Sequence, residues 1–263
     1  MFLTDPPIDR LAEIYPATYP GRAPARLSVA ERAKEFLDVR TLRRAIAEVD
    51  GDRLCLLDVG GGAGSMASVA QRADPRVQQT TVVDLDPSCE ALAVGRGHRY
   101  VCSAVEEFAA EEPFDVILLY GLLECVADPR GLLRRLRGLL STAGVLVVQT
   151  PNHDSLDARL FQHRSWSGLH CPRHWVLYDR ASLRLAAQAA GLTPTAVRYV
   201  PGAPFWGANL SVEARGPATD AAHPVHRRLS YKVASAAGGV LDVVRAPFAP
   251  TSQMVAFLRP KGP

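Results

Sequence analysis

The stretch LLDVGGGAGSMA, residues 56–67, constrains the fold of this chain more than any other feature. Its apolar run contains Asp58 near the end, and four glycines follow between positions 60 and 64. A short continuous apolar run indicates a buried strand, and a glycine-rich turn that opens a helix is typical of ligand-binding sites. The sequence therefore predicts a strand that passes through a tight turn into a helix, with the turn built to hold a ligand.

Strand-like and helix-like segments alternate along most of the chain. The strands are expected at residues 53–59, 79–86, 99–103, 114–121, 143–150, 192–200 and 251–260. Between them, helical segments are expected at residues 65–73, 87–95, 129–140 and 180–190. The strands are continuously apolar rather than alternating, which favours a parallel sheet covered by helices on both faces. We therefore expect an α/β fold with a doubly wound sheet.

The chain is expected to have four parts. Residues 1–50 form an N-terminal arm and a helix, which starts at the capping-box pair Ser28 and Glu31 and ends at Gly51. Residues 51–200 form the ligand-binding core, in which 151–178 is an insert that breaks the alternation. Residues 201–263 hold a second insert and the final strand.

The second insert, expected to be irregular over 201–250, contains an apolar stripe broken by Arg and Lys. It fits an acceptor lid, a dimer face or an interfacial helix. Gly238 and Gly239 weaken it as a helix. Among these alternatives we favour a lid or packing helix over membrane contact.

Charge and cysteine content exclude several classes of protein. The net charge of +3 is small, and the arginines are scattered, which favours solvated surface over a nucleic-acid interface. The five cysteines form no CxxC pair, and those at 55, 102 and 125 lie in or beside apolar runs, where a free thiol packs as a small buried hydrophobe. The first residues lack the pattern of a signal peptide, and no window is long enough to span a membrane. A cytoplasmic protein is expected.

The spacing of the glycines separates two kinds of nucleoside cofactor. A dinucleotide turn needs a third glycine three positions after Gly62, and that position holds Ser65. Asp84 ends the second strand, 24 positions after Gly60, where a carboxylate can accept both ribose hydroxyls of an adenosine. NAD and S-adenosylmethionine (SAM) share that group. Helix capping at this point is better assigned to Asp86 than to Asp84. Gly61 is expected to tolerate other residues.

Four segments together resemble the landmarks of class I SAM-dependent methyltransferases. They are LLDVGGGAGSMA, VVDLDPS, FDVILLYGLLECVADPRGLLRRLRGLL and AGVLVVQTPN, in the order and spacing of that family. The resemblance covers about residues 53–200. It implies a Rossmann-like sheet of seven strands that is parallel except for the last strand, with TSQMVAFLRP as that antiparallel strand. It also implies SAM as the cofactor.

Carried over position by position, the resemblance implies a set of cofactor-binding residues. They are Asp58, Gly60, Gly62, Gly64, Asp84, Leu85, Ser103, Ala104, Tyr120 and Gly121. The first four would hold the methionine part of SAM, Asp84 the ribose, and Leu85 would pack on the adenine. Ser103 stands where the family often has an acid, and Cys125 stands where His is common. Cys125 is expected to be a buried packing residue.

The insert at 151–178 supplies the candidates for the catalytic base. In the family this segment often roofs the acceptor pocket. It carries four of the seven histidines, at 153, 163, 170 and 174, and two tryptophans that could wall an acceptor. A neutral His suits a hydroxyl acceptor near pH 7, and His174 and His170 are favoured. A structural role, with His174 hydrogen-bonded to the backbone, is the alternative. No metal is expected, because no fourth ligand accompanies His170, Cys171 and His174.

These features predict a SAM-dependent methyltransferase that acts at an oxygen or nitrogen of a small molecule by in-line displacement. The alternatives are an NAD(P)-dependent oxidoreductase and a non-catalytic partner subunit with the same fold. The expected partner is a small-molecule acceptor, without nucleic acid or a membrane span, and a homodimer is compatible with the sequence.

Overall fold

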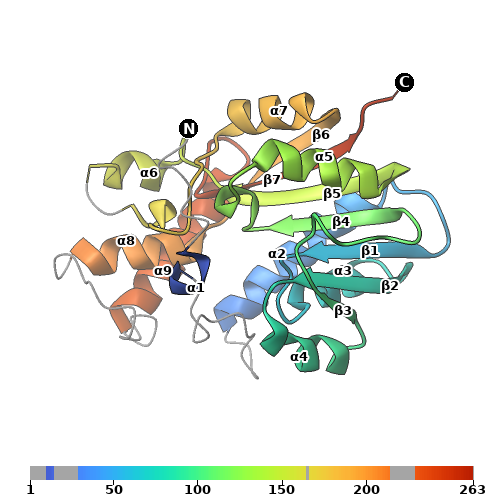
Figure 1. Cartoon of the computed structure of the whole chain (residues 1–263). Helices are drawn as coiled ribbons and strands as arrows, with labels where there is room; N and C mark the ends of the chain where they lie inside the picture. The colour runs from blue at the N-terminus through green and yellow to red at the C-terminus, as the bar shows by residue number, and fades with distance from the viewer. Residues whose placement is uncertain (1–9, 15–28, 164–165, 214–228, 263) are drawn as a thin grey trace.

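The chain folds around one seven-stranded sheet (Figure 1). The computed structural model describes residues 10–14, 29–163, 166–213 and 229–262. The strands are β1 (Leu54–Val59), β2 (Val77–Asp84), β3 (Arg99–Cys102), β4 (Phe114–Tyr120), β5 (Leu140–Pro151), β6 (Leu192–Val200) and β7 (Gln253–Pro260). Their order in the sheet is β3-β2-β1-β4-β5-β7-β6, and β7 pairs antiparallel with both neighbours while the pairs from β3 to β5 are parallel. The predicted seven-stranded sheet with an antiparallel last strand is confirmed.

Helices cover both faces of this sheet. The α-helices are α1 (Leu11–Ile14), α2 (Val29–Ile46), α3 (Ser65–Ala73), α4 (Glu90–Gly95), α5 (Pro129–Leu139), α6 (Leu156–Phe161), α7 (Arg180–Ala189), α8 (Ala203–Glu213) and α9 (Leu229–Arg245). Short 3-10 turns are η2 (Pro87–Cys89), η3 (Leu123–Cys125) and η4 (Ser167–Leu169). One core cluster joins α5 and α7 to one face of the sheet, and a second joins α2 and α3 to the other. The sheet is therefore doubly wound, as expected.

Helix starts follow the capping residues that the sequence offers. Asp128 accepts the Gly131 N–H at 2.8 Å, with Pro129 in the first turn of α5. Asp179 and Ser182 form a reciprocal capping box on α7. The expected start of α2 at Ser28 lies outside the described residues. That helix ends at Ile46 instead of Gly51, and a turn separates the two.

The segment 201–250 is where the prediction of irregular structure is wrong. It contains α8 and α9, which pack closely against each other. In Figure 1 the arrowheads of β1 and β4 point toward the side of the molecule where α6, α8 and α9 lie. These helices therefore extend the fold beyond the carboxyl ends of the strands, the edge at which open α/β sheets bind ligands.

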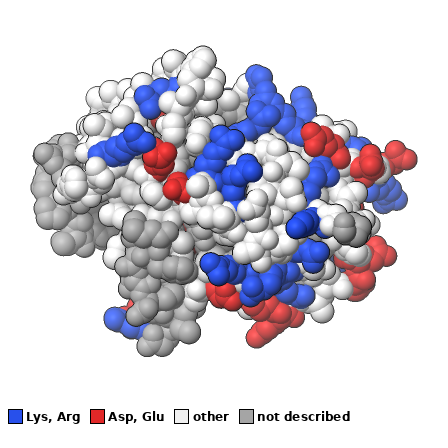
Figure 2. All heavy atoms as spheres, turned by 90° about the horizontal axis from the view of Figure 1, so that it is seen from above, with Lys and Arg blue, Asp and Glu red and all other residues white. Residues whose placement is uncertain are grey.

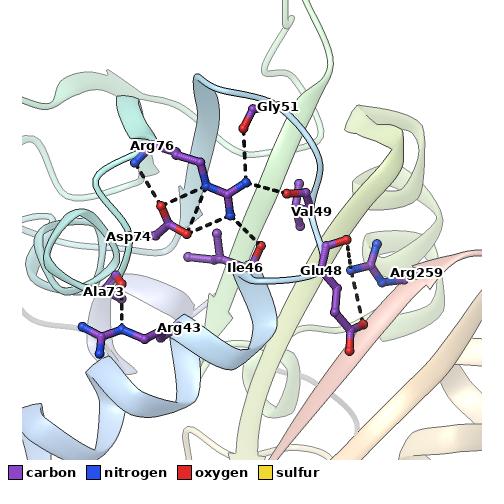
Figure 3. A network of polar contacts seen from close by, with 9 residues as sticks. All are labelled: Arg43, Ile46, Glu48, Val49, Gly51, Ala73, Asp74, Arg76 and Arg259. Atoms are coloured by element: carbon purple, nitrogen blue, oxygen red, sulfur yellow. Dashed lines mark hydrogen bonds and ion pairs between the residues drawn. The ribbon is translucent and has the colours of Figure 1, made fainter.

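The C-terminal end of α2 is tied to the sheet by one arginine (Figure 3). The Arg76 guanidinium donates to the carbonyls of Val49 (2.8 Å), Gly51 (3.1 Å) and Ile46 (3.2 Å). It also binds the Asp74 carboxylate, and the Arg76 hydrogen bond is the main reason that the pKa of Asp74 lies below its usual value. A single side chain thus satisfies three carbonyls that follow the helix.

Arg76→Ala is expected to lower the free energy of unfolding by about 2–3 kcal/mol, because three carbonyls and a carboxylate lose a charged donor. Urea unfolding measures the change. The control is Arg72→Ala, which breaks an ion pair with Glu35 at 2.9 Å in which the arginine side chain is 51% exposed. Such a pair is worth less than about 1 kcal/mol. Equal losses in both variants would contradict the anchoring role of Arg76.

The surface agrees in part with the expectations from composition. Figure 2 looks down on the side where α5 and α7 lie, and its blue Lys and Arg side chains are spread among uncharged ones. The exposed arginines of these helices are Arg130, Arg134, Arg137, Arg180 and Arg184. The five cysteines are thiols that take part in no disulfide. Cys102 is exposed on β3 at the edge of the sheet, which corrects its expected burial. Within the described ranges, no helix is both long and apolar enough to cross a bilayer.

Candidate active site

The turn between β1 and α3 has the backbone that its glycines were expected to provide. Gly60, Gly62 and Gly64 have φ angles of 67°, 52° and 73°, which lie in the left-handed region that favours glycine. A Cβ on Gly60 would lie 2.9 Å from Leu122 Cδ2, and a Cβ on Gly64 would lie 2.4 Å from His98 Cδ2. Backbone conformation and close packing therefore both require glycine at Gly60 and Gly64.

Gly61 corrects the expectation that its position tolerates other residues. A Cβ there would lie 2.5 Å from the carboxyl carbon of Asp58. Side-chain atoms essentially never approach so closely, and the Asp58 side chain is itself buried. Gly61, the middle one of the three consecutive glycines, thus makes room for the carboxylate of Asp58 beneath the turn.

Asp58 lies under the turn with only 1% of its surface exposed. Its Oδ2 accepts the Ala67 N–H of α3 at 3.2 Å. Burial raises the pKa of Asp58 to about 7, the Ala67 hydrogen bond opposes this rise, and the charge of Asp84 adds to it. A cation bound nearby would favour the ionised form. The site therefore holds a carboxyl group whose charge is costly until a positively charged ligand arrives.

Asp58→Asn is expected to stabilise the ligand-free protein much more at pH 8 than at pH 5. The folded pKa of Asp58 is above its unfolded value, so the folded state binds more protons and stability falls as pH rises from about 4 to 7. Asn does not ionise and avoids this loss, which amounts to as much as about 4 kcal/mol for a shift of about three units. Urea unfolding at both pH values measures it. A gain of the same size at pH 5 would contradict the titration.

Asp84 closes the other side of the turn. It is the last residue of β2, and β2 pairs with β1. Its Oδ2 accepts the Gly62 N–H at 2.8 Å, and its Oδ1 accepts the Asp86 N–H at 2.9 Å. The expected division of roles is seen, because Asp86 caps η2 through the Ser88 N–H while Asp84 does not. Each oxygen of Asp84 has a further lone pair to offer a ligand.

The residues expected near the adenine lie next to Asp84. Leu85 follows it with 65% of its surface exposed, so a flat apolar ring could cover it. The Ser103 N–H donates to the Asp84 carbonyl at 3.1 Å. The hydroxyl of Ser103 is buried, and no described residue hydrogen-bonds it. Ala104 follows and accepts the Phe108 N–H at 3.1 Å. The orphaned Ser103 hydroxyl is the kind of group that a polar ligand completes.

Tyr120 and Gly121 end β4 on the same edge of the sheet. Gly121 has φ 64° and donates its N–H to the Gln149 carbonyl at 3.0 Å. The Tyr120 hydroxyl is buried, and among the described residues it has no hydrogen-bond partner. Burial first, and then the charges of Asp38 and Asp58, raise its pKa well above 10. Tyr120 therefore stays neutral and serves as a wall or donor rather than a base.

Glu124 and His174 form a pair that the sequence alone did not indicate. Their side chains are 2% and 10% exposed, and Glu124 Oε1 lies 4.0 Å from His174 Nε2. The other oxygen of Glu124 is buried without a hydrogen bond among the described residues. Glu124 Oε1 is also 3.8 Å from the place of a Gly121 Cβ. The pair therefore adjoins the end of β4, beside Leu122, which packs against Gly60.

The pKa values of Glu124 and His174 are shifted in opposite directions. Burial raises the pKa of Glu124 to about 7. Burial lowers the pKa of His174, which the hydrogen bond to the Gly168 carbonyl partly offsets. In the neutral His174 the Nδ1–H donates to that carbonyl at 2.8 Å, which leaves the lone pair on Nε2. His174 thus has the expected backbone hydrogen bond, and its unprotonated Nε2 faces Glu124 and His170.

His170 lies beside His174, as their spacing suggested. Its Nδ1 is 3.4 Å from His174 Nε2, and the two rings meet edge to face. His170 itself is exposed. Glu124, Cys125 and His174 place one ligand-type atom each within 4.8 Å of one another, so these three residues could hold a metal ion, whereas Cys171 is exposed and outside the group. Cys125 is only half-buried, which corrects its assignment as a buried packing residue.

The other aromatic residues of the insert have structural positions. His153 Nε2 lies 3.5 Å from Asp179 Oδ2, and His163 is exposed. Trp166 donates to Asp157 at 2.8 Å and Trp175 to the Pro172 carbonyl at 2.6 Å, and both rings are almost fully buried. The tryptophans therefore pack the interior of the insert.

His98 is the other residue that the sequence did not reveal. It is 3% exposed, and its ring nitrogens contact the hydroxyls of Ser68 (2.8 Å) and Thr80 (2.7 Å). Its ring lies where a side chain on Gly64 would be. His98 therefore supports the turn from below and holds α3 against β2.

The glycine turn and the polar residues around it fit an adenosyl cofactor that has a positively charged amino acid part. A buried carboxyl group lies under the turn, a second carboxylate has spare lone pairs, and the Ser103 hydroxyl is unsatisfied. Ser65 is the first residue of α3, so the helix starts where a dinucleotide turn needs its third glycine. These observations define a SAM-binding class I fold.

Comparison with known proteins agrees. The sequence profile of the family described as a methyltransferase domain matches residues 29–197. The chain belongs to this family, and its cofactor site is that of a SAM-dependent methyltransferase. A structural neighbour is the plantazolicin methyltransferase BpumL in complex with a triazolic analogue and SAH (S-adenosylhomocysteine). The TM-score is 0.54 at 15% sequence identity, and the match covers 95% of this chain and 89% of that one.

Two curated relatives are more similar in sequence over a shorter length. A tRNA 5-carboxymethoxyuridine methyltransferase of Escherichia coli (strain K12) is 33% identical over 126 residues, which cover 44% of this chain and 47% of the relative. A ubiquinone biosynthesis O-methyltransferase of Rhodopseudomonas palustris (strain HaA2) is 31% identical over 109 residues, which cover 38% and 41%. The chain thus matches less than half the length of these relatives.

Proposed function

We propose that the protein transfers the methyl group of SAM to an oxygen or nitrogen atom of a small-molecule acceptor. When bound, SAM would supply an electrophilic methyl group on a sulfonium; the acceptor atom would bond to that methyl carbon as the carbon–sulfur bond breaks and the thioether leaves. The observation that carries the proposal is Nε2 of His174, the unprotonated nitrogen of the neutral ring, which lies next to the end of β4 and faces Glu124 Oε1 at 4.0 Å and His170 Nδ1 at 3.4 Å. Its lowered pKa keeps the imidazole neutral near pH 7, the form that accepts a proton.

Positioning is the larger contribution to such a reaction. Aligning two reactants is worth about 7–11 kcal/mol, whereas a general base adds about 10²- to 10⁴-fold in rate. Asp84, Asp58 and the glycine turn would fix the cofactor, and the insert at 151–178 would cover the acceptor and exclude water. His174 would take the proton that leaves an acceptor hydroxyl or ammonium, with His170 as the next candidate.

Oxygen is favoured because one of the relatives is a ubiquinone biosynthesis O-methyltransferase. A nucleic-acid acceptor is the second candidate, because the other relative is named for tRNA and because α5 and α7 carry exposed arginines without an acidic residue. The small-molecule acceptor is preferred, since the net charge of +3 gives little attraction to a polyanion.

The test uses SAM with a labelled methyl group and separate acceptor pools of phenols, carboxylic acids, amines and bulk tRNA. Label in a small-molecule pool is the expected result. Label in tRNA alone would overturn the small-molecule acceptor. Absence of SAM and S-adenosylhomocysteine (SAH) binding in calorimetry at millimolar ligand would overturn the cofactor assignment, and a larger thermal shift with NADH would favour the oxidoreductase alternative.

We also propose a cytoplasmic location, which the five cysteine thiols support. Light scattering on the purified protein tests the homodimer. Tight SAM binding without turnover on any pool, together with a stable protein partner, would favour the non-catalytic alternative.

A further inference from the structure

The inner face of α9 is built from small and polar residues. Gly238 faces Trp206 of α8 so closely that a Cβ would lie 2.1 Å from the indole Cγ. Asp242 is 1% exposed, and its Oδ2 accepts the Gly202 N–H (3.0 Å) and the Ser252 hydroxyl (2.9 Å). On α8, Gly207 faces Ser235 and Tyr231 of α9 in the same way. The contact between these helices therefore uses glycine, serine and a buried carboxyl group.

The outer face of α9 carries the large apolar side chains. Leu229, Val233, Val240 and Val244 are 76%, 59%, 65% and 63% exposed. Their spacing of four, seven and four residues places them along one side of a helix. Leu241 and Val243 flank this row and Phe248 follows it, also exposed. We call these seven residues the apolar stripe.

This distribution is the reverse of that of an ordinary surface helix, which turns its apolar side inward. The apolar stripe contains half of the exposed large apolar side chains in the described part of the chain, within a span of 20 residues. Asp242, in contrast, is buried on the inner side. A contiguous apolar patch of this kind marks a surface that contacts a membrane or another molecule.

The charged side chains beside the apolar stripe indicate which kind of surface the stripe contacts. Lys232 is exposed beside the apolar stripe, whereas Arg245 is half-buried, with its Nε buried, on the side of Gly238 and Asp242. Asp242 is the only acidic residue of α9, and it points inward, so the described outer face of α9 carries Lys232 and apolar side chains without an acidic group. A second copy of the chain would bring like charges together without an acidic partner on this helix. Anionic lipid headgroups would neutralise them.

We propose that α9 lies in the interface of a bilayer that contains anionic lipids, with the apolar stripe at the boundary of headgroups and acyl chains. Helix α9 packs on α8, and α8 packs on α6 and η4 at the edge where the strands end (Figure 1). A bilayer at α9 therefore adjoins the helices that extend past the cofactor site. This binding is peripheral, and it does not depend on the identity of the methyl acceptor.

The test is co-sedimentation of the full chain with vesicles of phosphatidylcholine alone or with a quarter of phosphatidylglycerol. The wild type is expected to bind the anionic vesicles, and Val240→Glu/Val244→Glu is expected to reduce the partition coefficient at least tenfold. Leu185→Glu, at a site on α7 that is 66% exposed, is the matched control and should bind as the wild type does. Lys232→Glu should weaken binding mainly at low salt.

Thermal unfolding and SAH binding verify that each variant remains folded, and both should be unchanged because the substituted residues face solvent. No wild-type binding at 1 mM anionic lipid would overturn the proposal. So would an equal loss in Leu185→Glu. A dimer in light scattering that Val240→Glu dissociates, without vesicle binding, would assign the apolar stripe to a second copy and also overturn it. Each result is independent of methyl transfer.

Discussion

His174→Asn is expected to lower kcat by about 10²- to 10⁴-fold while the Kd for SAH stays within about threefold of wild type. Asn keeps an N–H that can donate to the Gly168 carbonyl, as His174 Nδ1 does at 2.8 Å, but it has no nitrogen that accepts a proton. The variant therefore separates the base from the structural hydrogen bond. Methyl-transfer kinetics and SAH calorimetry on the same samples measure the two effects.

The pH profile adds a second readout. In the wild type, kcat should rise with pH as His174 loses its proton, at a pH below that of an ordinary histidine because burial lowers its pKa. That limb should disappear in His174→Asn. His170→Asn is the control, since this exposed residue has a smaller expected effect. Full activity in His174→Asn would leave His174 with the structural role alone.

Asp84→Ala is expected to raise the Kd for SAH by about 10²-fold or more. Two charge-assisted hydrogen bonds to ribose hydroxyls contribute about 1.5–3 kcal/mol each. The substitution also frees the Gly62 N–H, which now donates to Asp84 Oδ2, so the turn loses a support as well as a ligand contact. Calorimetry measures the affinity, and circular dichroism shows whether the fold is retained.

Asp86→Ala is the matched control, because Asp86 is a neighbouring acid that caps η2 through the Ser88 N–H. It should cost some stability and leave the Kd for SAH nearly unchanged. An unchanged Kd in Asp84→Ala would place this residue outside the cofactor site. An equal loss in both variants would mean that the turn is sensitive to any nearby change.

The sheet was predictable because its strands are continuous apolar runs separated by capping residues and glycines. Helix α3 and strand β6 have the bounds that the sequence predicted, whereas the antiparallel direction of β7, which is confirmed, was implied by the family resemblance and not by a local signal. Local signals suffice where the period of the apolar pattern and the caps agree.

Helix α8 was missed, and a helix at α9 was only one of the alternatives for its segment, because the contacts that stabilise both helices are tertiary. Gly238 weakens an isolated helix, and only the position of Trp206, 32 residues earlier, shows that this glycine permits close packing. The buried Asp242 likewise depends on Gly202 and Ser252. Sequence periodicity assigns the apolar side of a helix to the interior, whereas α9 turns its small and polar side inward.

Some residues of the candidate site were likewise predictable from the sequence, and others were not. Asp58 and Asp84 were recognisable because each lies at a fixed distance from the glycines. The Glu124 and His174 pair joins residues 50 positions apart, and His98 contacts Gly64 across 34 positions. Such contacts follow from the path of the chain through the sheet rather than from any local spacing.

The position of β7 between β5 and β6 has a consequence for synthesis on the ribosome. In the described sheet β6 pairs only with β7, which is the last strand in the chain. As the nascent chain emerges, β1 to β5 can associate first, whereas β6 has no partner until residues 253–260 leave the exit tunnel. The final strand must then insert between two earlier ones, which makes its pairing a late and long-range step. Ribosome stalling after residue 250 should therefore leave β6 accessible to proteases.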